Sequence, residues 1–193
     1  MILWLKARRA LVVLPACLVV FIVLVISVQD AIVPLPSLTG RSQVTLSLFL
    51  PVPLVAGIAR CLELKLSAPE VTGVRPVPLA DMAMVTAVAS IGFALCATAG
   101  SLLDTPQAFA TGRNVLFLVG LMLIGRSVAG EVAVMIPVGW LILTVFVGFR
   151  GPGDPYAWSI IAEPARVLHA AVAALLVFLA GLFLMPRTSR KLS

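Results

Sequence analysis

The sequence contains few of the side chains on which enzymes and metal sites depend. It has one histidine, His169, and three cysteines, Cys17, Cys61 and Cys96. The cysteines are far apart and lack both CxxC spacing and a histidine at a ligand interval, so they predict neither a disulfide framework nor a metal site. Neither a Gly-x-Ser-x-Gly nor an H-E-x-x-H motif occurs. We therefore expect no catalytic, cofactor-binding or metal-binding residue in this chain.

Charge is also scarce, and long polar stretches are missing. Charged residues make up 11% of the chain, against about 25% in soluble domains, and 61% of the residues are hydrophobic. The longest hydrophilic interruption, about twenty residues, is too short to bury a core of its own. No G-x-x-x-x-G-K-[ST] phosphate loop occurs, so the chain is not expected to hydrolyse a nucleotide. The composition predicts one all-α membrane domain over residues 1–193.

Apolar stretches long enough to cross a bilayer, which takes about 20 helical residues, account for most of the sequence. We predict a polytopic helix bundle with six transmembrane helices, at residues 10–28, 44–59, 82–103, 115–130, 132–149 and 167–185. Pro51 and Pro53 are expected to break the second span midway. The apolar run 115–149 would be about 52 Å long as one helix, so we divide it at GRSVAGE.

Basic residues predict the orientation, because Lys and Arg are enriched in cytosolic loops. With both termini and loop 60–81 cytosolic, ten basic residues fall inside: Lys6, Arg8, Arg9, Arg60, Lys65, Arg75, Arg126, Arg187, Arg190 and Lys191. Four fall outside, where the segment 150–166 also lies: Arg41, Arg113, Arg150 and Arg166. We therefore predict a multi-pass membrane protein with both termini in the cytosol. The net charge of +6 then reflects orientation in the lipid bilayer, and gives no reason to expect nucleic acid as a partner.

Arg126 and Glu131 are the charges inside the long apolar run. In the six-span arrangement they fall at the cytosolic turn between the fourth and fifth spans, where both can reach water. The alternative is that they face an internal pathway, since ionisable groups at membrane depth often mark transport sites. Gly130 lies between them, and their spacing does not enforce a helical ion pair. Both interpretations stay open.

Small side chains recur every four residues in the third span, at Thr86, Ser90, Ala94 and Thr98. This spacing puts them in one row along a helix. Such rows are typical of closely packed membrane helices. The facing helix could belong to this chain or to a second membrane subunit.

The order of these features resembles the membrane subunit of bacterial type 2 (ABC-2) ABC transporters, in its compact actinobacterial form. Three stretches carry the resemblance: RCLELKLSAPEVTGVRPVPLAD, RNVLFLVGLMLIGRSVAGEVAVMIPVGWLILTVFVGF and GPGDPYAWSIIAEPAR. It covers nearly the whole chain and implies six spans, a coupling helix in loop 60–81, and a short-helical excursion on the outer side before the last span. The family's usual first amphipathic helix is reduced to MILWLKARR at most, and the proline-broken second span departs from the pattern.

The resemblance implies a permease subunit of an ATP-driven exporter that is not itself an enzyme. ATP and magnesium would be bound by separate ABC ATPase subunits, and a second membrane subunit, identical or similar, would complete the pathway. The residues that the resemblance implies for the ATPase contact are Leu62, Glu63, Leu64, Lys65, Leu66, Glu70 and Arg75. The loop could equally be polar simply because it lies in water.

Two other functions remain open at the level of sequence. The first is a non-transporting membrane assembly or immunity protein that acts by binding a partner through its loops. The second is an intramembrane enzyme that would use His169. The sequence does not indicate the transported substrate, because apolar walls could pass a lipid, a hydrophobic peptide or an antibiotic.

Overall fold

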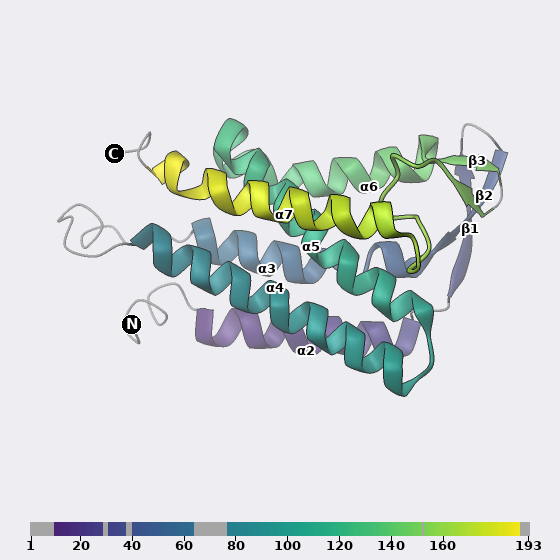
Figure 1. Ribbon diagram of the computed structural model, residues 1–193, viewed down its shortest axis with the longest axis horizontal. Coiled ribbons are helices and arrows are strands. Elements are labelled where there is room, and N and C mark those ends of the chain that lie inside the picture. Colours follow the sequence, from purple (N-terminus) through teal and green to yellow (C-terminus); the bar gives the residue numbers. More distant parts are fainter. Residues whose placement is uncertain (1–9, 29–30, 38–39, 64–76, 152, 190–193) are drawn as a thin grey trace.

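The apolar stretches form helices that run up and down a bundle, and short strand pairs close one end of it (Figure 1). The computed structural model describes residues 10–28, 31–37, 40–63, 77–151 and 153–189. The helices are α2 (Ala10–Val28), the 3-10 helix η1 (Leu46–Leu48), α3 (Val52–Glu63), α4 (Val77–Leu102), α5 (Pro106–Ala129), the 3-10 helix η2 (Gly130–Val134), α6 (Met135–Val147) and α7 (Leu168–Ser189). The strands are β1 (Ile32–Ser37), β2 (Gly40–Thr45), β3 (Phe149–Gly151) and β4 (Asp154–Pro155).

Within the described residues, five helical segments are long and apolar enough to cross a membrane. They are Ala10–Val28, Leu46–Glu63, Leu79–Leu102, Pro106–Ala129 and Leu168–Met185. The remaining apolar segment, Val132–Val147, is shorter. At helical rise it covers about 25 Å, less than the bilayer core of about 30 Å. The fold is thus that of a helical membrane bundle, and a sixth crossing stays a prediction.

Several predicted boundaries change. The first span matches α2 residue for residue. The predicted break in the second span falls before α3, because Pro51 precedes that helix and Pro53 lies in its first turn, where a missing backbone N–H costs little. The prediction of a loop before residue 115 is wrong, since α5 begins at Pro106, and α4 begins at Val77 and not at 82.

The segments at the far end of the bundle form antiparallel strand pairs that the sequence did not predict. Strand β1 pairs with β2 from Ile32 opposite Thr45 to Ser37 opposite Gly40, and β3 pairs with β4 around the turn at Gly153. The outer segment therefore has strands and turns where the resemblance implied short helices. Strand pairs satisfy backbone groups that the helix-breaking prolines would otherwise leave unpaired.

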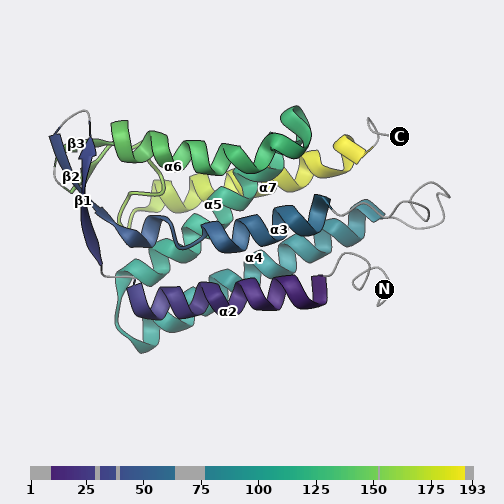
Figure 2. The same ribbon diagram turned by 180° about the vertical axis from the view of Figure 1, so that it is seen from behind.

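The ends of the bundle differ (Figures 1 and 2). The first residue of α2, the end of α3, the start of α4 and the end of α7 lie together at one end, and the strands lie at the other. The turn between α5 and α6 lies at the first of these ends, because Arg126 of α5 contacts the last turn of α3. We call these the connector end and the strand end.

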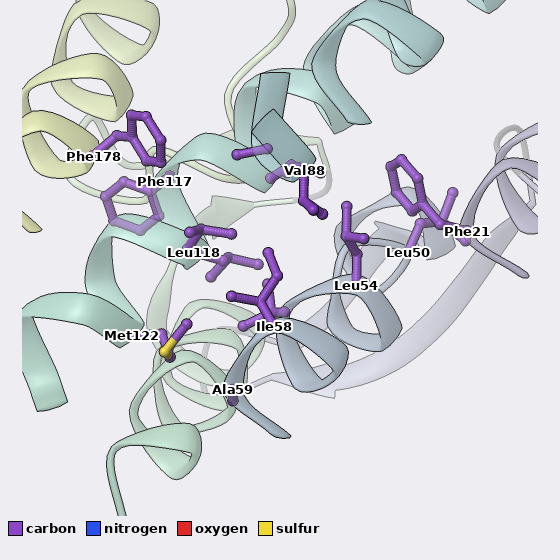
Figure 3. Packing of buried hydrophobic residues seen from close by; sticks show 14 of the residues in the cluster. Phe21, Leu50, Leu54, Ile58, Ala59, Val88, Phe117, Leu118, Met122 and Phe178 are labelled. Atoms are coloured by element: carbon purple, nitrogen blue, oxygen red, sulfur yellow. The ribbon is translucent and has the colours of Figure 1, made fainter. Parts of the chain in front are cut away.

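Helix α5 is the most buried of the long helices and α2 the least. Figure 3 shows Ile58 of α3 directed toward Leu118 of α5, and Leu54 of α3 near Phe21 of α2. Helix α2 instead exposes Val12 and Ile26 to the surroundings, as expected for a lipid-facing helix.

The closest helix crossing joins α5 and α7. A Cβ atom added at Gly120 would lie 2.6 Å from the backbone N and Cα of Phe178, and one at Gly181 would lie 2.7 Å from the carbonyl oxygen of Gly120. Only glycine allows the two backbones to approach this closely. The pair holds the last helix against the central one.

Candidate functional site

Two buried polar residues of α5 hold the chain that precedes α7 against the bundle at the strand end. Arg113 donates from Nη2 to the carbonyl oxygen of Glu163 at 2.7 Å and from Nη1 to that of Pro164 at 3.0 Å. Its Nε and Nη2 also reach Oδ1 of Asn114 at 3.3 and 3.2 Å. Asn114 in turn donates to the carbonyl oxygen of Ile161 at 2.8 Å. Arg113 is 5% exposed and Asn114 is 1% exposed.

The neighbouring charge for this guanidinium is Glu163. The Glu163 side chain is 11% exposed, and its carboxylate lies 3.7 Å from Nε2 of His169 in the first turn of α7. A buried charge is costly unless it is hydrogen-bonded and has an opposite charge nearby; Arg113 donates hydrogen bonds to two carbonyls and to Asn114, and Glu163 is the neighbouring opposite charge. The cluster therefore joins α5, the irregular segment and α7. We call Arg113, Asn114, Glu163 and His169 the strand-end cluster.

This arrangement gives His169 a structural partner. The alternative of an intramembrane enzyme needs a nucleophile beside the imidazole. In the structure His169 faces Glu163, and Ser159 donates its hydroxyl to the carbonyl oxygen of Gly148 at 3.1 Å. The contacts of both residues hold the outer segment in place.

An aromatic row continues from the bundle into the same segment. The ring centroids of Phe117 and Trp140 are 5.6 Å apart, those of Trp140 and Trp158 are 6.1 Å apart, and those of Trp158 and Tyr156 are 6.3 Å apart. The Arg150 guanidinium lies over the Tyr156 ring, 4.9 Å from its centroid. Such amphipathic rings are enriched at the membrane surface, so Tyr156 and Trp158 would suit the headgroup level of a bilayer.

Arg126 occupies the connector end, in the last turn of α5. Its Nη2 donates to the carbonyl oxygen of Leu62 at 3.2 Å. The last carbonyls of a helix lack partners within the helix and carry the negative end of its dipole, so a guanidinium there is favoured twice. The predicted division at GRSVAGE is confirmed, because α5 ends at Ala129 and Gly130 has a φ of 63°. The side chain of Glu131 lies outside the described residues.

The predicted ATPase-contact residues are only partly described. Leu62 is buried in the bundle core, and its contact with an ATPase stays a prediction. Glu63 lies 3.6 Å from Arg60, one turn earlier in α3, as a partly exposed pair. The other predicted contact positions lie outside the described residues, and these are Leu64, Lys65, Leu66, Glu70 and Arg75.

Most of the row of small residues is left uncovered by the described part of the chain. Ser90, Ala94 and Thr98 are exposed on α4, and Thr86 is half-buried. The Thr98 hydroxyl is satisfied within the helix by the carbonyl oxygen of Leu95 at 2.9 Å. No helix in the described part of the chain therefore covers these three residues. A contact with a second subunit stays a prediction.

Sequence reasoning missed the strand-end cluster because it took Arg113 and Asn114 as part of a loop. The signal was present in Thr105 and Pro106, since proline is favoured at the first position of a helix. A helix starting there places both polar side chains two turns inside it, where they need buried partners. Comparisons of the chain with family models, curated proteins and solved structures found no match.

Proposed function

We propose that the chain is the membrane-spanning permease subunit of an ATP-driven exporter of the ABC type in a bacterial cell membrane. It would work with separate ABC ATPase subunits, which bind ATP and magnesium, and with a second membrane subunit. The chain itself would catalyse no reaction. Its contribution would be a bundle whose helices rearrange when the partner ATPases close.

The observation that carries the proposal is the hydrogen bond from Arg126 to the Leu62 carbonyl oxygen. Leu62 lies in the last turn of α3, shortly before residues 64–76. These residues connect α3 to α4, and we call them the connector. Arg126 lies in the last turn of the central helix α5, before the turn into α6. A partner that moves the connector would thus move α3 and the α5–α6 turn together. This is the coupling that an exporter without its own ATPase requires.

Three further features support the same function. The start of α2, the end of α3, the start of α4, the α5–α6 turn and the end of α7 gather at one end of the bundle, where one cytosolic partner could reach them (Figure 1). Arg60 and Glu63 at the end of α3 offer charges of both signs there. Ser90, Ala94 and Thr98 leave one face of α4 open to a second subunit.

An ABC ATPase encoded beside this chain is expected to copurify with it and to hydrolyse ATP faster in its presence. In Arg126→Gln the ATPase should still bind, but stimulation should fall about fivefold or more, the lower end of typical coupling free energies. The measurement is a pull-down together with steady-state ATP hydrolysis in lipid nanodiscs. Arg166→Gln is the matched control, because it removes an exposed cation at the strand end, away from the proposed ATPase contact.

Equal stimulation in Arg126→Gln and the parent would remove the coupling role of this contact. The absence of any copurifying ATPase would instead favour the non-transporting alternative, a membrane protein that acts by binding a partner through its loops.

The orientation has a test of its own. A cysteine placed at Leu66 is expected to resist an impermeant thiol reagent added to intact cells, and one placed at Asp154 to react with it. Asp154 is exposed at the strand end, whereas the natural Cys61 and Cys96 are buried and give little background. Labelling after permeabilisation controls for reactivity at Leu66. Reaction at Leu66→Cys in intact cells would invert the proposed orientation and put the connector out of reach of a cytosolic ATPase.

A further inference from the structure

A cavity of about 290 Å³ lies at the strand end, between the bundle and the segment held by Arg113. Its walls come from η1, the first turns of α5, the β3–β4 pair and the residues before α7. Most lining residues are apolar, among them Leu48, Phe149 and Ile161. Binding sites for small molecules have this character, an apolar wall with a few polar groups that fix orientation.

The polar residues of the lining favour a positively charged ligand. It consists of the Thr45 and Ser47 hydroxyls, the Gln107 amide and Glu163. Among the described lining residues, Glu163 is the only one that carries a charge. The nearby cation Arg113 is not part of the lining, and its donors bind backbone carbonyls and Asn114. Among the described lining residues, a ligand therefore meets hydroxyl and amide groups and one carboxylate, and no cation.

The wall around Glu163 is fixed before any ligand arrives. Ile161, Glu163 and Pro164 are lining residues of the cavity. Their carbonyl oxygens accept hydrogen bonds from Asn114 or Arg113. A wall that is already ordered lowers the entropic cost of binding.

The volume limits the ligand. Drug-sized ligands occupy cavities of about 300–1,000 Å³, so this one accommodates only a compact molecule and excludes a whole phospholipid or a long peptide. We infer that the cavity binds a small amphiphilic amine, with its ammonium paired to Glu163 and its apolar body against Leu48, Phe149 and Ile161. The same ammonium chemistry is offered by a free amine and by an ethanolamine headgroup. This inference does not depend on an ATPase, and it holds or fails separately from the proposed function.

The test uses the purified full chain in a detergent without amines, with 2-phenylethylamine as probe and 2-phenylethanol as its uncharged counterpart. Titration calorimetry or ligand-detected NMR should show saturable binding of the amine, and binding of the alcohol about tenfold weaker or more, the value of one charge-assisted hydrogen bond. Glu163→Gln should weaken amine binding to the level of the alcohol. Ala110→Leu, which fills the cavity from α5 and leaves every charge in place, should abolish it.

Ala171→Leu is the matched control, since Ala171 is exposed on α7 and is not among the lining residues. It should bind the amine as the parent does.

Competition by a short-chain phosphatidylethanolamine would assign the site to lipid headgroups, and a lack of competition would assign it to free amines. Equal affinity for amine and alcohol, or equal binding by Ala110→Leu and Ala171→Leu, would overturn the inference. If Glu163→Gln does not fold, the Ala110→Leu comparison decides.

Discussion

Gly120→Ala is expected to destabilise the bundle by about 2 kcal/mol, although alanine is the better helix former. The added Cβ would lie 2.6 Å from the N and Cα atoms of Phe178 and 2.7 Å from the carbonyl carbon of Val177. All three are backbone atoms, so α7 as a whole must move away from α5. Overpacking of this kind costs about 1–3 kcal/mol, and we take the upper end. The helix propensity gained, up to about 1 kcal/mol, offsets part of it.

Gly139→Ala provides the matched control. Gly139 lies within α6, and a Cβ there would meet nothing within 4 Å. The same gain in helix propensity then appears without a clash, so this variant should be more stable than the parent by up to about 1 kcal/mol. Reversible unfolding in mixed micelles, titrated with a denaturing detergent, measures both. A shift of the same sign for the two variants would show that the α5–α7 contact does not limit stability.

The presence of long apolar helices was predictable because their length is set by the bilayer rather than by any neighbour. The apolar run at residues 10–28 needed only counting, and α2 occupies Ala10–Val28. The turn after α5 followed from the same argument, since a helix from 115 to 149 would be too long for a bilayer and Gly130 could supply the positive φ that the turn uses. These are local properties of the chain.

The contacts between spans were not predictable, because they depend on which helix lies opposite. The spacing of Ser90, Ala94 and Thr98 predicted a close contact, but these residues face outward, and the closest crossing joins Gly120 to Gly181 instead. Neither glycine stood out in the sequence, since each is a single small residue in an apolar run. Their role exists only once α5 and α7 are side by side.

The strand-end cluster was missed for a related reason. Polar residues beside an apolar run were taken to mark water, which is the usual case at a span boundary. Arg113 departs from it because its donors find the carbonyls of Glu163 and Pro164, in an irregular segment that lacks helical partners for them. Arg113 and Asn114, which the sequence placed in an exposed loop, are buried and hold the segment before α7 against the bundle.

Arg113→Met is expected to destabilise the strand end by about 3 kcal/mol. Methionine fills much of the volume but donates no hydrogen bond, so the carbonyls of Glu163 and Pro164 lose their donors and the Glu163 carboxylate loses its neighbouring cation. A buried acceptor left without its donor costs about 1–3 kcal/mol, and two carbonyls lose their donors here, so we expect about 3 kcal/mol in total. Amide hydrogen exchange over residues 148–166 should then quicken by about a hundredfold, while exchange in α3 stays unchanged.

Two further variants test whether the hydrogen-bond geometry of the Arg113 guanidinium matters beyond its positive charge. Arg113→Lys keeps the cation but cannot reach two carbonyls and Asn114 at once, so its exchange rates should fall between those of the parent and Arg113→Met. Arg150→Met removes an exposed arginine from the same segment, where its described contact is the Tyr156 ring, and should cost about 1 kcal/mol or less. If Arg113→Met and Arg150→Met quicken exchange equally, the buried cluster does not hold the segment. If only Arg113→Met does, the wall of the cavity beside Glu163 depends on a side chain that is not itself among the lining residues.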